Sequence, residues 1–157
     1  MSVTTGQQLK DLGGGLFSAV SSTEKTRVQQ ALVKRVITVP WSMVAVAAGA
    51  DSTQYIWTCP SSLVNGVRIL SASWLAPATL AAEATNYITL TLYNGSDSVG
   101  AITSVNAMTA GAPRAFTVST TYNNVAAGGV LKLTKTYAAS GTALVSGGIL
   151  TLEVEEL

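Results

Sequence analysis

The sequence predicts an all-β protein, an eight-stranded antiparallel β-sandwich preceded by an extended N-terminal arm. Three observations lead to this prediction. From residue 36 onward, apolar and polar residues alternate at a period of two, which is typical of strands with one buried face. Gly, Asn and Pro separate these stretches, and no helical periodicity intervenes. Charged residues are concentrated at the start of the chain: residues 1–35 contain seven and residues 36–157 contain only ten.

Residues 1–35 are predicted to form an arm rather than a part of the core. Residues 1–20 are mostly polar or Gly, and their isolated apolar side chains are too few to build a core. Ser21 and Glu24 resemble a capping box, and the apolar residues that follow recur at helical spacing. A short helix is therefore expected over about residues 23–33.

The β-sandwich domain, residues 36–157, is predicted to contain eight strands. We place them at residues 36–47, 53–58, 64–75, 86–94, 99–105, 114–120, 130–137 and 143–155. Alternation is clearest where Ile88, Leu90 and Leu92 would face the core. The pair Gly147-Gly148 falls inside the last strand and indicates a bulge or a break. Eight strands with connections of uneven length favour a jelly-roll-like sandwich over a propeller or a solenoid.

The composition argues against an enzyme. The chain contains no His, which is the commonest general base and a frequent metal ligand. The single cysteine, Cys59, is expected to be buried at the end of a strand as a small hydrophobic residue. Glu153 and Glu155 share one face of the last strand at a spacing found in some glycosidases. With Glu156 they are better interpreted as a charged end that keeps this strand soluble and prevents edge pairing.

Cofactors, metals and small-molecule substrates are accordingly not expected. The most apolar stretch, residues 36–50, is interrupted by Pro40 and Ser42 and is too short to cross a bilayer, so no membrane association is expected. Five cations and two acids in the arm give a charge density far below that of a nucleic-acid-binding domain. These cations are better suited to an acidic protein surface, where they would steer docking and fix register.

Two groups of residues are candidates for contacts with other proteins. The arm contributes Lys10, Leu12, Leu16, Phe17, Lys25, Arg27, Lys34 and Arg35. The second group is Trp41, Trp57 and Trp74, which all lie in predicted strands and are interpreted as core or interface side chains. A solvent-accessible Trp57 or Trp74 beside a groove would instead indicate glycan binding.

Three stretches carry a resemblance to a known family: VITVPW at residues 36–41, GVRILSASW at 66–74 and LTLEV at 150–154, set among strands rich in Ala, Thr, Ser and Gly. With them, the chain resembles the capsid decoration, or cement, proteins of tailed bacteriophages. The resemblance implies a jelly-roll-like subunit without catalytic residues, often trimeric, which is assembled in the host cytoplasm and placed on the outer capsid surface. Such subunits occupy three-fold or quasi-three-fold positions, and an extended terminus reaches a neighbour.

The partners implied by this resemblance are the major capsid protein and further copies of the chain. Two alternatives remain open. The first is a head-fibre or tail module that binds a receptor or a glycan. The second is a minor shell or tail structural protein with the same sandwich.

Overall fold

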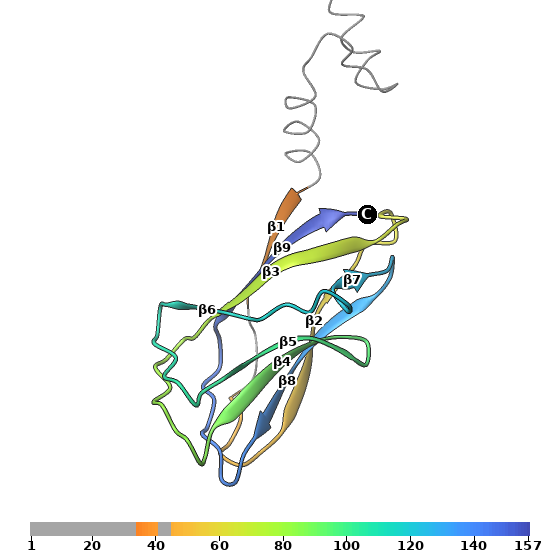
Figure 1. The fold of residues 1–157 in the computed structure, drawn as a ribbon. Helices are drawn as coiled ribbons and strands as arrows, with labels where there is room; N and C mark the ends of the chain where they lie inside the picture. Colours follow the sequence, from red (N-terminus) through yellow and green to blue (C-terminus); the bar gives the residue numbers. More distant parts are fainter. Residues whose placement is uncertain (1–33, 41–44) are drawn as a thin grey trace, which may run out of the picture. The chain divides into compact units, whose positions relative to one another are not determined.

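The computed structural model describes residues 34–40 and 45–157, which form two packed antiparallel β-sheets (Figure 1). One sheet has the order β1 (Lys34–Pro40), β9 (Ile149–Glu156) and β3 (Val67–Leu75), followed at its far edge by β6 (Pro113–Ala115) and β7 (Asn124–Val125). The other has the order β2 (Ser52–Thr58), β8 (Val130–Tyr137), β4 (Ile88–Asn94) and β5 (Asp97–Thr103). The predicted all-β sandwich is therefore confirmed. The helix predicted at residues 23–33 lies outside the described residues.

The strands pair in nested order along the chain. β4 pairs with β5, β3 with β6 and β7, β2 with β8, and β1 with β9. Successive pairs alternate between the two sheets. Within each sheet the two pairs are joined by a further pairing, that of β3 with β9 in one sheet and that of β4 with β8 in the other. The first and last strands therefore lie side by side although they come from opposite ends of the domain.

The core lies between the inner faces of the two sheets. Ile88, Leu90 and Leu92 of β4 are fully buried as predicted, because alternate residues of a strand point to the same face. The largest buried side chain is that of Trp74 in β3. It is joined by the inward residues of the neighbouring strands, among them Ile69, Leu131, Leu133, Leu150, Leu152 and Val154. Burial of each such side chain contributes about 1.5–3 kcal/mol before the loss of conformational entropy is counted.

The last predicted strand, residues 143–155, begins later than expected. β9 starts at Ile149 because Gly147 and Gly148 adopt φ angles of 96° and 112°, so the interpretation of this pair as a break is confirmed. β9 also lies between β1 and β3 rather than at a sheet edge. The expectation that its terminal acidic residues protect an exposed edge is therefore wrong.

Two other predicted strands differ most from the structure, whereas the strand predicted at residues 64–75 begins three residues later, at Val67. The first strand was placed at residues 36–47, but β1 begins two residues earlier and ends at Pro40. Of residues 114–120, only the first two belong to a strand, the short β6. The chain then crosses to the other sheet, where the Ser119 N–H donates to the Val99 carbonyl, and it returns to β3 as the two-residue β7, which the sequence did not predict.

Candidate assembly site

The start of β1 lies beside the end of β9, because the Arg35 guanidinium forms an ion pair with the Glu156 carboxylate. Arg35 shares the inward face of β1 with Ile37 and Val39, which pack against the core. The chain enters the described sandwich at this end. The charge of Arg35 is thus neutralised within the domain at the point where residues 1–33 are attached.

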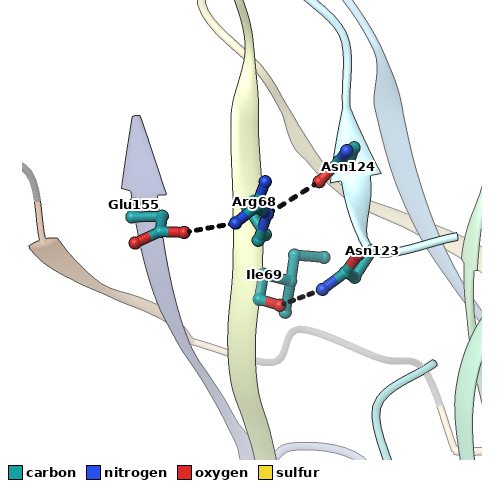
Figure 2. A network of polar contacts seen from close by, with 5 residues as sticks. All are labelled: Arg68, Ile69, Asn123, Asn124 and Glu155. Atoms are coloured by element: carbon teal, nitrogen blue, oxygen red, sulfur yellow. Dashed lines mark hydrogen bonds and ion pairs between the residues drawn. The ribbon is translucent and has the colours of Figure 1, made fainter. Parts of the chain in front are cut away.

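A second ion pair joins three strands at the same end of the sandwich. Figure 2 shows Arg68 of β3 between Glu155 of β9 and Asn124 of β7. Its Nη1 atom lies 3.0 Å from Glu155 Oε1, and its Nε–H donates to Asn124 Oδ1 at 3.2 Å. The neighbouring Asn123 donates its Nδ2–H to the Ile69 carbonyl at 3.0 Å. These contacts hold β9, β3 and β7 in register and neutralise Glu155.

Two further polar side chains also have partners within the chain. Asn94, at the β4–β5 hairpin, donates its Nδ2–H to the Asn124 carbonyl at 2.7 Å and so links the two sheets. Glu153 accepts a hydrogen bond of 3.3 Å from the Ser71 hydroxyl. Glu153 and Glu155, the pair whose spacing is found in some glycosidases, are therefore both engaged by residues of β3.

Exposed apolar side chains and a shallow cavity accompany these neutralised charges. The cavity has a volume of about 110 Å³ and is lined by residues 62–66 together with Glu156 and Leu157. Val64 is 80% exposed, and Val36, which follows Arg35 in β1, is 69% exposed. We call this group the assembly site; it comprises Val36, Val64, Leu157, the cavity and the Arg35–Glu156 pair.

The structure places only some of the predicted contact residues. Lys34 is the first residue of β1, and Arg35 forms the ion pair with Glu156. Trp74 lies in the core, and Trp57 is half-buried against it. The others lie outside the described residues: Lys10, Leu12, Leu16, Phe17, Lys25, Arg27 and Trp41.

Val64 was not among the predicted contact residues. Its sequence signal is an apolar residue in a turn-forming stretch, with Ser61 and Ser62 before it and Asn65 and Gly66 after it. The strand predicted at residues 64–75 included Val64, but β3 begins at Val67, so Val64 lies in the preceding turn and has no strand face through which to reach the core. Its turn-forming neighbours are the signal that could have indicated its exposure, whereas the adjoining cavity has no signal in the sequence.

Cys59 is fully buried, as predicted, and burial raises the pKa of its thiol, which a backbone hydrogen bond with Gly128 opposes only in part. The reactive thiolate is thereby disfavoured. In the described ranges no three His, Cys, Asp or Glu side chains gather as a metal site would require. No described helix has the length and apolarity needed to cross a membrane.

Comparison with known proteins assigns no family. No protein-family model matches the chain, and no curated protein is significantly similar to it. Function must therefore be inferred from the fold and from the surfaces of the sandwich.

Proposed function

We propose that this chain is a virion structural protein that decorates and stabilises a bacteriophage capsid at inter-capsomer, three-fold-like positions, with residues 1–35 clamping neighbouring subunits. The assembly site is the observation that carries the proposal. It exposes Val36, Val64 and Leu157 beside charges that already have partners within the chain. Another protein can cover such a surface without leaving a buried charge unpaired, and it gains from the apolar area removed from water.

The sandwich is proposed to be a jelly roll. The nested pairing supports this, because it puts β1, β9, β3 and β6 or β7 in one sheet and β2, β8, β4 and β5 in the other. Two Greek keys wound together give this distribution of strands. Jelly rolls are common in viral capsid proteins, so the fold is compatible with the proposed role without determining it.

The proposed partners are the major capsid protein and two further copies of the chain, on the outer surface of the capsid. In a homotrimer each arm needs only modest affinity for its neighbour. Once one subunit is bound, the contacts of the others become intramolecular, and avidity can exceed single-site affinity by about 10² to 10⁴. The clamp therefore acts through the number of contacts rather than through a single strong one.

The test is a pull-down of the purified protein with empty capsids that lack it. The full chain is compared with Val64→Asp and with a deletion of residues 1–33, which leaves β1 intact. The control is Val145→Asp, because Val145 is 48% exposed in the connection before β9, at the opposite end of the sandwich. Val64→Asp introduces a charge that would lose its solvation in the contact.

We expect the full chain and Val145→Asp to remain on the capsids, and Val64→Asp and the deletion to be washed off. Light scattering of the purified chain should give the mass of a trimer. Unchanged capsid occupancy for both test variants, with folding verified by circular dichroism, would refute the proposed role of this end.

A further inference from the structure

We infer that the outer face of the β2-β8-β4-β5 sheet binds an acidic saccharide through a row formed by Tyr55, Lys132 and Tyr93. This inference goes beyond the proposed capsid role and does not depend on it. The row comes from three adjacent strands, because Tyr55 of β2 is directly opposite Lys132 of β8, which is directly opposite Tyr93 of β4. All three side chains point away from the core, since Leu131 and Leu133, on either side of Lys132, are fully buried.

Tyr55 is the most unusual member of the row. Its side chain is 75% exposed, although an aromatic ring in a strand usually buries much of its area. A register shift between Tyr55 and Trp57 explains the orientation, because the extra residue turns Trp57 toward the core and leaves Tyr55 outside. The bulge thus presents a flat ring to solvent at the edge of the sheet.

Lys132 is held in place beside the second ring. Its Nζ lies 5.4 Å from the centre of the Tyr93 ring, within the range of a cation–π contact. The cation–π contact does not use up all three N–H donors of the ammonium group, so Lys132 can still donate hydrogen bonds to a ligand. The positions of Tyr55 and Tyr93 are two strand spacings apart, about 10 Å, with the cation between them.

Hydroxyl groups line the adjacent row of the same face. Thr53, Thr134 and Thr91 lie opposite one another across β2, β8 and β4, and the hydroxyls of Thr53 and Thr134 are 3.0 Å apart. On β5 the row ends at Ala101, which lies opposite Thr91, and neither row contains a larger aliphatic side chain. A protein interface core would call for aliphatic and aromatic groups packed together, whereas these rows offer rings and hydroxyls.

Those groups match the chemistry of a sugar. The C–H groups of a pyranose ring carry partial positive charge and can stack on the negative face of a tyrosine ring. Its hydroxyls can exchange hydrogen bonds with threonines. Lys132 is the only ionised side chain in the two rows, so a carboxylate on the sugar gains a charge-assisted hydrogen bond without meeting a like charge. Single-stranded nucleic acid also stacks on aromatic rings, but it needs a cationic groove along its backbone, and one lysine does not supply it.

The test is titration calorimetry of the full chain with oligosaccharides of galacturonate, glucuronate or sialic acid, each compared with its methyl-esterified, uncharged form. The variants are Tyr55→Ala and Lys132→Met. The control is Tyr122→Ala, because Tyr122 is 47% exposed but lies between β6 and β7, outside both rows. Thermal unfolding of every variant should match that of the parent protein, since the changed side chains are not part of the core.

We expect at least one acidic oligosaccharide to bind more tightly than its ester. Tyr55→Ala should weaken binding of both forms by about tenfold, through loss of the stacking surface. Lys132→Met should weaken the acidic form by about fivefold and leave the ester unchanged. Tyr122→Ala should change neither.

Three results of the calorimetry would overturn the inference. These are no binding of any acidic oligosaccharide at millimolar concentration, binding that survives Tyr55→Ala, and equal or tighter binding of an oligothymidylate that responds to the same variants. The capsid pull-down is a separate readout, in which Tyr55→Ala should keep full occupancy. Loss of occupancy by Tyr55→Ala would be a fourth result against the inference, because it would show that this face contacts another protein rather than a saccharide.

Discussion

Lys135 is the only fully buried charged residue in the described part of the chain. It lies on the inward face of β8, and its Nζ–H donates to the Ala47 carbonyl at 3.0 Å. Burial lowers the pKa of Lys135, and nearby Asp51, which favours the charged form, offsets this only in part. A cation is therefore retained in the core at a cost in stability, with its ammonium group hydrogen-bonded to a backbone carbonyl.

We predict that Lys135→Met raises the free energy of unfolding by roughly 1 kcal/mol at neutral pH, because an apolar side chain of similar length replaces a buried charge. The Ala47 carbonyl keeps a partner, since it also accepts the Ala50 N–H at 3.3 Å. Urea denaturation measures the change, and Lys132→Met on the outward face of β8 should stay within about 0.5 kcal/mol of the parent protein. A large loss of stability in Lys135→Met alone would show that the ammonium is needed to hold Ala47.

The gain in stability from Lys135→Met should depend on pH, and the sign of this dependence follows from the direction of the pKa shift of Lys135. Because the pKa of Lys135 in the fold lies below 10.5, the folded protein releases this proton at a lower pH than the unfolded chain. The penalty for burying the charge is complete below the folded pKa and disappears as the pH rises toward 10.5. The advantage of Lys135→Met should therefore shrink over that range. Cys59 titrates in both proteins, so its contribution cancels in the difference, and an advantage that stays constant with pH would contradict the assignment.

At the scale of elements, the close approach of the chain before β3 to β7 depends on Gly66. Gly66 and Gly111 have similar left-handed backbones, with φ of 79° and 73°, but a Cβ at Gly66 would lie 2.2 Å from the Val125 carbonyl oxygen. A Cβ at Gly111 would meet nothing within 4 Å. Gly111→Ala should therefore cost only the left-handed backbone penalty of about 1–2 kcal/mol, while Gly66→Ala should cost about 2 kcal/mol more. Similar unfolding free energies for the two variants would contradict the tight contact between these segments.

The elements that the sequence predicted well are those with strict alternation. Residues 130–137 were placed without error, and residues 86–94 differ from β4 by two residues at the start. β7 has only two residues, and its pairing depends on where β3 lies rather than on any local pattern. The central position of β9 was missed for the same reason, because the order of strands in a sheet is set by contacts between distant parts of the chain.

The ion pair of Arg35 could not be predicted from the sequence, because its partner Glu156 lies far away along the chain and only the pairing of β1 with β9 brings them together. The sequence did not single out Tyr55 among the aromatic side chains that could bind a glycan. Without a bulge, Tyr55 and Trp57 would share one face of β2, and alternation alone does not reveal the register shift that separates them.

Nested pairing makes the last strand more important for the stability of the sandwich than the first, because β9 has two neighbouring strands and β1 has one. β9 pairs with both β1 and β3 and buries Leu150, Leu152 and Val154, so its removal would open the middle of one sheet. We predict that deleting residues 149–157 abolishes cooperative unfolding. Deleting residues 1–33 should preserve it, because β1 and the inward side chains of Ile37 and Val39 remain.

Urea denaturation followed by far-ultraviolet circular dichroism distinguishes the two deletions. The protein that lacks residues 1–33 should show a single transition with a midpoint close to that of the full chain, and the protein that lacks residues 149–157 should show none. A cooperative transition without β9 would mean that β1 and β3 can close the sheet directly. Loss of the transition without residues 1–33 would make the arm part of the core, and a segment needed for folding could not also be free to clamp a neighbouring subunit.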